Sequence, residues 1–286
     1  MWAITGKCEY SYDCDKWFNG CGNCPYLNEY PVIFQDKTKE LWQIKKEIYE
    51  NSNLTIVTPS KWLYNLVKTS PLLKDKRVYH IPYVLDLDTF KAKDKKASKK
   101  ALEIRESEKV IMFAPYDIKI KRKGFDLLLQ VLKNIDLRLK EKITLLLVGN
   151  SIDNNVEFKN FNIKEIGFVQ NEKMLSICYN ASDIFLLPSR NDNYPLVLME
   201  AISCGVPSVT FDIGGCGEIV ESGKNGFAVT PFDLKEFEDR LYLLLESPEI
   251  LDQYSKNCKN FAKKSFSNVT TKYYELFKNL VEAKNG

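Results

Sequence analysis

The sequence predicts an α/β protein in which parallel strands alternate with helices that cover both faces of the sheet. From residue 110 onward, short unbroken apolar runs alternate with segments whose apolar residues recur at helical spacing. Unbroken apolar runs of strand length are typical of strands buried on both faces, as in parallel sheets. With 286 residues, 44% of them hydrophobic, the chain is long enough for one large domain or two modest ones.

The expected elements follow from these runs in chain order. In the first part of the chain, the pattern predicts helices over 37–51 and 60–69 and strands over 54–57 and 78–81. In the second part, it predicts helices over 124–135, 171–182 and 195–205, and strands over 110–114, 143–149, 162–169, 183–188, 207–212 and 226–229.

A basic segment, KAKDKKASKK (91–100), separates the two parts. It contains six lysines and almost nothing to bury, so we interpret it as a solvated linker or the start of a helix. Contact with anionic lipid is the alternative.

The composition narrows the class of protein. The formal net charge is +3 with 28% charged residues, and this near balance does not favour nucleic acid as a partner. No apolar run is long enough to span a bilayer, and no signal-peptide pattern opens the sequence. We therefore expect a cytoplasmic protein whose eight cysteines are reduced.

The stretch PSRNDNYPLVLMEAISCG (188–205) follows a predicted strand and carries two acids. Ligands of open parallel sheets bind outside the carboxyl ends of the strands, so Asp192 lies where a ligand is expected. A plain helix cap is the alternative role for this residue. Pro195 suits the first turn of the following helix. The amides of Leu196, Val197 and Leu198 would then lack intrahelical partners and form a site suited to phosphate.

Glu200 lies further along the same predicted helix, flanked by LVLM and AI. A solvated helix residue is the alternative interpretation. An acid in apolar surroundings needs hydrogen-bond donors, however, and a ribose or hexose diol supplies them. Glu200 is therefore a candidate for binding the sugar of a nucleotide or of its donor group.

These residues resemble a known family. The pair Asp192 and Glu200, with Pro195 between them, is similar to the E-x7-E motif of family 4 glycosyltransferases, although its first acid is aspartate. The match runs from about residue 54 to the C-terminus. Five further stretches resemble the family in its own order, namely HIPYVLDLDTFK, KRKGFDLLL, IGFVQNEKMLSICYNASDIFLLPS, CGVPSVTFDIGGCGEIV and ESGKNGFAV.

The resemblance implies a GT-B fold, in which two Rossmann-like domains face each other across a cleft. It implies a retaining hexosyltransferase that needs no catalytic metal or other catalytic cofactor. The donor would be a nucleotide-sugar and the acceptor a glycan or lipid-linked glycan. Such an enzyme would act in cell-surface polysaccharide biosynthesis, in the cytoplasm or in peripheral association with the inner face of the membrane.

The same resemblance assigns roles by position. Asp192, which would meet the donor hexose, and Lys123, which would neutralise the diphosphate, are the predicted catalytic residues. Glu200 would bind the ribose hydroxyls. The full donor-binding set is Glu200, Arg122, Pro195, Leu196, Val197 and Gly149.

The first part of the chain is short for the domain it resembles. We expect a partial N-terminal, acceptor-side domain over 1–90, a C-terminal nucleotide-sugar-binding domain over 91–265, and a helix over 266–286 that packs back toward the N-terminal part. The sequence is thus predicted to be N-terminally truncated. The competing function is a non-catalytic nucleotide-sugar-binding module. A nucleotide-sugar epimerase or a phosphorylase is a third interpretation. An epimerase would need additional acid and base residues, which the sequence does not show.

Four cysteines cluster near the start of the sequence as C-x5-C-x6-C-x2-C. Four thiolates in a short polar loop could hold a structural zinc ion tetrahedrally. Reduced thiols that cap a loop, or disulfides, are the alternatives. The candidate ligands are Cys8, Cys14, Cys21 and Cys24.

Overall fold

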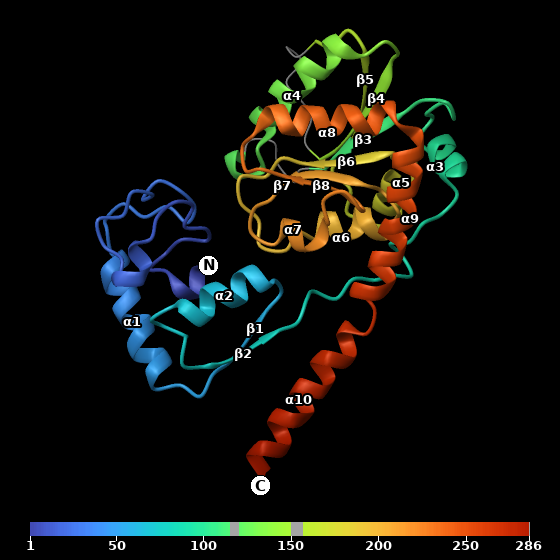
Figure 1. Cartoon of the computed structure of the whole chain (residues 1–286). Helices are drawn as coiled ribbons and strands as arrows, with labels where there is room; N and C mark the ends of the chain where they lie inside the picture. The colour runs from blue at the N-terminus through green and yellow to red at the C-terminus, as the bar shows by residue number, and fades with distance from the viewer. Residues whose placement is uncertain (115–119, 150–156, 286) are drawn as a thin grey trace. The chain divides into compact units, whose positions relative to one another are not determined.

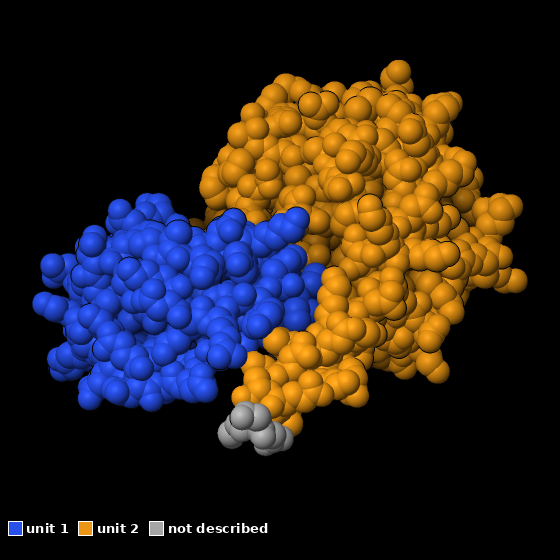
Figure 2. Space-filling model, turned by 60° about the horizontal axis from the view of Figure 1, so that its bottom comes forward, with its two compact units in different colours: residues 1–82 blue, residues 83–286 orange. Residues whose placement is uncertain are grey.

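The computed structural model describes residues 1–114, 120–149 and 157–285. The chain divides into two compact units, Met1–Pro82 (unit 1) and Tyr83–Gly286 (unit 2), which are coloured separately in Figure 2. The division falls at Pro82 rather than at residue 90, because the segment after Tyr83 packs on unit 2. Phe90 is buried there against Tyr179, with 6.2 Å between the ring centroids.

Unit 2 is built on a six-stranded sheet in the order β5-β4-β3-β6-β7-β8, and every pairing is parallel. The parallel sheet predicted from the apolar runs is therefore confirmed. The strands β3, β4, β6 and β7 are buried along their whole lengths, as is typical of central strands in a parallel sheet that is covered on both faces. The strands are β3 (Val110–Phe113), β4 (Ile143–Val148), β5 (Phe161–Gly167), β6 (Ile184–Leu187), β7 (Ser208–Phe211) and β8 (Gly226–Val229).

Helices cover both faces of this sheet (Figure 1). Alternate residues of β3 enter different cores: Ile111 packs with α4 and α8, whereas Met112 packs with α5, α6 and α9. The helices of unit 2 are α3 (Lys95–Ala101), α4 (Phe125–Arg138), α5 (Glu172–Ala181), α6 (Leu196–Ser203), α7 (Cys216–Ile219), α8 (Leu234–Glu246), α9 (Pro248–Ser265) and α10 (Val269–Asn285).

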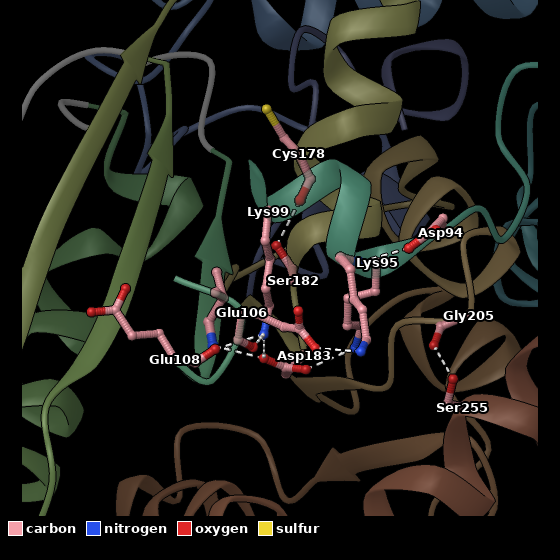
Figure 3. A network of polar contacts seen from close by, with 12 residues as sticks. Asp94, Lys95, Lys99, Glu106, Glu108, Cys178, Ser182, Asp183, Gly205 and Ser255 are labelled. Atoms are coloured by element: carbon pink, nitrogen blue, oxygen red, sulfur yellow. Dashed lines mark hydrogen bonds and ion pairs between the residues drawn. The ribbon is translucent and has the colours of Figure 1, made fainter. Parts of the chain in front are cut away.

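The basic segment starts a helix, as predicted, but it is not a solvated linker throughout. The Asp94 carboxylate caps α3 by accepting from the amides of Lys96 and Ala97. Lys99 is buried and lies 3.3 Å from the carboxylate of Asp183, which Lys95 also contacts at 2.7 Å (Figure 3). Lysines of this segment therefore anchor α3 to the residue that precedes β6.

Unit 1 contains far less regular structure. Its sheet has two parallel strands, and residues 1–37 form only two short 3-10 helices. Its small core includes Ile4, Trp17 and Leu73. Its elements are η1 (Trp2–Ile4), η2 (Lys16–Asn19), α1 (Thr38–Glu50), β1 (Thr55–Thr58), α2 (Lys61–Thr69) and β2 (Arg77–His80).

Two buried lysines hold the irregular part of unit 1. The ammonium group of Lys7 donates to three backbone carbonyls, at 2.8–3.0 Å, and that of Lys45 donates to two. The carbonyls belong to Leu27, Glu29 and Pro31 for Lys7, and to Trp2 and Thr5 for Lys45. Among the residues described in both units, no helix is long and apolar enough to cross a membrane.

Candidate functional site

The candidate site lies in unit 2, at the carboxyl ends of the central strands. β6 ends at Leu187, and the loop that follows leads into α6. The segment after β3 ends in the short helix η3 (Lys121–Lys123), and that after β7 begins at Asp212. Parallel strands bring these loops to one edge of the sheet, where open α/β sheets bind their ligands.

Asp192 and Lys123 meet at this edge, although 69 residues separate them in the chain. The Nζ of Lys123 donates to Oδ2 of Asp192 at 2.8 Å, and the guanidinium of Arg122 lies 3.6 Å from the same oxygen. Asp192 is only 7% exposed, and the hydroxyl of Ser189 also donates to it at 3.4 Å. One buried carboxylate therefore orients two cations, and the three groups together carry one excess positive charge.

Asp192 does not act as the helix cap that the alternative interpretation assigned to it. The N-cap position of α6 is Pro195, and no side chain caps it. Within the described residues, the amides of Leu196 and Val197 have no hydrogen-bond acceptor. The expectation for Leu198 is wrong, because its amide donates to the carbonyl of Pro195 at 3.1 Å. Two amides rather than three are thus directed outward at the positive end of α6.

Two glycines allow the loops of the site to approach one another closely. A Cβ on Gly214 would lie 1.7 Å from the carbonyl oxygen of Asp192, and one on Gly124 would lie 1.9 Å from that of Pro188. Both glycines also have positive φ, of 53° and 70°. Only glycine fits these positions, so the loops that carry Lys123 and Asp192 are held together at backbone distance.

Arg190 adds a side-chain clamp between the same loops. Its guanidinium makes two hydrogen bonds of 2.6 Å to Asp126, in the first turn of α4, and a third to the carbonyl of Lys121. Its own amide donates to the carbonyl of Arg122 at 2.7 Å. The pKa of Asp126 is lowered, chiefly by the hydrogen bonds from Arg190. Sequence reasoning missed this clamp, because a charged residue in a loop carries no signal of its partner.

Glu200 lies in α6, where its Oε2 accepts a hydrogen bond of 2.7 Å from the hydroxyl of Tyr179 in α5. Burial raises the pKa of the Glu200 carboxyl, while the Tyr179 hydroxyl acts in the opposite direction. Glu200 is therefore not the solvated helix residue of the alternative interpretation. Sequence reasoning did not assign Tyr179 to the site, although the tyrosine stands within a stretch that resembles the family pattern.

An apolar cavity of about 160 Å³ adjoins Glu200 through Tyr179. The cavity is lined by residues at the ends of β3 and β4, in the segment after β5, and in α5 and α6. Gly149 and Val197 are among these lining residues. The exposed ring of Phe168, a residue not predicted for the site, forms another wall. A ligand with a flat aromatic ring in this cavity and a polar part at the half-buried Glu200 carboxylate fits this arrangement.

The four clustered cysteines lie in unit 1, away from these residues in the sequence and in a different unit. They are free thiols that line one small cavity, and burial raises the pKa of Cys8 to about 11. Across residues 1–114, 120–149 and 157–285, no three histidine, cysteine, aspartate or glutamate side chains are already placed to hold a metal ion.

Known proteins resemble both the sequence and the fold. Residues 94–264 match the family described as glycosyl transferases group 1. WcaC of Escherichia coli, named as a colanic acid biosynthesis glycosyl transferase, is 25% identical over 223 residues, covering 77% of this chain and 52% of WcaC. The N-acetyl-alpha-D-glucosaminyl L-malate synthase of Bacillus anthracis is 25% identical over 228 residues, which cover 77% of this chain and 58% of that enzyme.

Solved structures share the fold. The sucrose-phosphate synthase of Thermosynechococcus elongatus aligns with a TM-score of 0.71 and 20% identity, over 88% of this chain and 65% of that one. HepE of Anabaena, in a complex with UDP-glucose, aligns with a TM-score of 0.67 and 19% identity, over 85% of this chain and 68% of that one. The open parallel sheet thus matches GT-B glycosyltransferase structures.

The match to the family covers more than half of the chain, including α4, α6 and the loops of the candidate site. The chain spans about half to two thirds of the length of WcaC, of the N-acetyl-alpha-D-glucosaminyl L-malate synthase and of an uncharacterized protein in a cps region of Klebsiella pneumoniae. On the strength of the family match, this chain belongs to the glycosyl transferases of group 1.

Proposed function

We propose that unit 2 binds a nucleotide-sugar and that the protein transfers its sugar, with retention of configuration, to a glycan or lipid-linked glycan. The observation that carries this proposal is the contact of Lys123 and Arg122 with one buried carboxylate, Asp192, beside the start of α6. Cations and outward amides gathered at one sheet edge fit a diphosphate. The proposal places the protein in family 4, as a hexosyltransferase.

The positive groups would act on the leaving diphosphate. When the bond between sugar and phosphate breaks, negative charge grows on the phosphate oxygens, and fixed cations and amides stabilise it. Asp192 holds Lys123 in place before the donor arrives, so little reorganisation is needed. Lys123 and Arg122 then supply the positive charge that a metal ion would otherwise bring, and we propose a metal-independent reaction on this basis.

The donor hexose would lie next to Asp192. Front-face departure of the diphosphate, with the acceptor hydroxyl entering on the same side, retains the configuration at the anomeric carbon and needs no nucleophile from the protein. Asp192 would contact the sugar hydroxyls with the lone pairs that Lys123 leaves available. Its remaining contacts with Arg122 and Ser189 keep the carboxylate in position during this exchange.

The nucleoside would occupy the other half of the site. Glu200 would accept hydrogen bonds from the ribose hydroxyls, and the base would enter the cavity beside Phe168 and Gly149. The complex of HepE with UDP-glucose supports this class of donor. WcaC and a Klebsiella pneumoniae relative named for a cps region support polysaccharide biosynthesis as the setting. We place the protein in the cytoplasm, at the inner face of the membrane where lipid-linked acceptors lie.

The test removes the carboxylate that would bind ribose. Glu200→Ala should weaken the binding of nucleoside diphosphates by roughly 1.5–3 kcal/mol, as expected for hydrogen bonds to a charged group. Titration calorimetry with UDP, GDP and ADP measures this change. Glu246→Ala, at an exposed acid at the end of α8, is the control and should leave affinity unchanged.

Unchanged affinity in a folded Glu200→Ala protein would contradict the assignment of Glu200. Transfer is measured separately, with nucleotide-sugars and glycan or lipid-linked acceptors. If the protein binds the nucleotide but transfers sugar to none of these acceptors, the result would favour the nucleotide-sugar-binding module over the enzyme.

A further inference from the structure

We propose that unit 1 holds a structural zinc ion on the thiolates of Cys8, Cys14, Cys21 and Cys24. The four cysteines come from separate turns of the irregular segment that precedes α1, and all four line one cavity of about 10 Å³. That volume is about the size of a single water molecule, so the cavity fits an ion rather than an organic ligand. The inference does not depend on the proposed sugar transfer.

The side chains that line this cavity favour zinc over other metal ions. No carboxylate and no imidazole belongs to it, so sulfur supplies all four possible anionic ligands. Four thiolates in tetrahedral arrangement are typical of zinc or of an iron–sulfur centre. A single-ion cavity with a C-x2-C pair favours zinc over a cluster of several atoms.

The backbone around Cys21 has the form of a ligand-holding turn. Four consecutive residues, Gly20 to Asn23, have positive φ, and two of them, Cys21 and Asn23, are not glycine. Left-handed backbone in non-glycine residues persists where the surroundings enforce it, which is common at ligand-binding sites. The amide of Gly6 donates to Sγ of Cys21 at 3.2 Å, a contact that orients the sulfur and favours the thiolate.

Positive charge close to the thiols offsets the charge of the complex. Four thiolates with Zn²⁺ carry a net charge of −2, which is costly to bury alone. Lys7 lines the cavity, and Lys45 is near enough to Cys8 and Cys21 to interact with them electrostatically. Both ammonium groups are buried and held by backbone carbonyls, so two fixed cations face this charge.

Binding closes the loop and releases protons. Because the four sulfurs do not yet form a group placed to hold a metal, zinc must draw them inward from the walls of the cavity. Each thiol loses its proton as its sulfur bonds to zinc, so one Zn²⁺ displaces up to four protons. The ion would then cross-link a segment of 37 residues that has only two 3-10 helices of its own.

The test is metal analysis of the whole chain, purified with reductant from zinc-supplemented cells. We expect about one zinc per chain, as for a structural site. Cys21→Ser/Cys24→Ser should lose the metal, and Cys178→Ala, at a buried cysteine of unit 2, should retain it. Because the double variant could fail to fold, wild-type protein is also stripped with a chelator and titrated with Co²⁺, whose thiolate absorption bands report tetrahedral sulfur ligands.

Thiolate absorption bands that saturate at one Co²⁺ per chain, and that disappear when Zn²⁺ displaces the cobalt, would support the site. Reduced protein that contains no zinc and takes up neither metal would overturn it. Iron in place of zinc would overturn it as well, as would two disulfides found by peptide mass when free thiols are alkylated without reductant.

Discussion

Unit 2 and unit 1 differ in what holds them together. Unit 2 has six parallel strands between two apolar cores, and its buried backbone is paired strand to strand. Unit 1 has two strands and one small core, and its loops depend on the side chains of Lys7 and Lys45. The comparison teaches that apolar packing stabilises the one unit, whereas a few polar side chains determine the conformation of the other.

The chain itself supplies separate probes for the two units. All four tryptophans, Trp2, Trp17, Trp42 and Trp62, belong to unit 1, so their fluorescence follows unit 1 alone. Far-ultraviolet circular dichroism follows mainly unit 2, which contains all the long helices except α1. A change in stability can therefore be assigned to one unit.

The largest effect is expected in the core of unit 2. Leu132 in α4 is 0% exposed, and Leu132→Ala should lower the free energy of unfolding of unit 2 by roughly 2–5 kcal/mol through the cavity it creates. The dichroism transition in urea should shift while the tryptophan transition stays in place. Leu137→Ala on the same helix is the control, since Leu137 is 85% exposed. Equal shifts of the dichroism and tryptophan transitions would mean that the two units unfold together, which would contradict separate stabilisation of each unit.

A smaller effect should come from a single polar anchor in unit 1. Lys45→Met keeps most of the side-chain volume but removes the hydrogen bonds from the ammonium group to the carbonyls of Trp2 and Thr5. The expected loss is roughly 1–3 kcal/mol, read from the tryptophan transition. Lys46→Met is the neighbouring control, because Lys46 makes only an exposed 3.8 Å ion pair with Glu50 and should change stability by about 0.5 kcal/mol or less. A Lys45→Met protein as stable as the control would show that unit 1 does not depend on this lysine.

The smallest effect concerns pH and the site in unit 2. Burial raises the pKa of Glu200, so its contribution to stability is present below the ordinary pKa of glutamate and is lost as the pH rises through the raised value. Glu200→Gln removes this titration. The ligand-free variant should therefore gain stability over the wild type across that pH window, while its nucleotide affinity falls.

Urea unfolding at a series of pH values measures this difference by dichroism. Glu246→Gln, at an exposed residue of the same unit, should show no such trend. A stability difference between Glu200→Gln and wild type that does not grow with pH would contradict the role of burial at this carboxyl.

Much of unit 2 could be predicted because the central strands β3, β4 and β6 are largely apolar runs. The strands expected over 110–114 and 143–149 are β3 and β4, and their parallel pairing follows from the helix between them. Apolar periodicity identifies an element and its buried face, which is enough to place Asp192 at a carboxyl edge.

The remaining features depend on partners that are distant in the sequence. The sequence around Lys99 predicts a solvated lysine, whereas in the fold Lys99 contacts Asp183, which is 84 residues away in the sequence. The hydrogen bond between Tyr179 and Glu200 and the clamp between Arg190 and Asp126 arise in the same way. Local sequence patterns do not indicate such pairs, because the two residues come together only in the folded chain.

The close approach at Gly124 and Gly214 has a consequence for the design of altered donor specificity. Both positions lie against a carbonyl oxygen of the loop after β6, so the loop has two fixed points and a variable stretch near them. A mutant library that keeps both glycines, together with the buried Ser189 and Tyr194, can vary the half-buried Asn193 in this stretch. New donor specificity would then come from side-chain changes on a loop whose backbone path depends on the absence of a Cβ at Gly124 and Gly214.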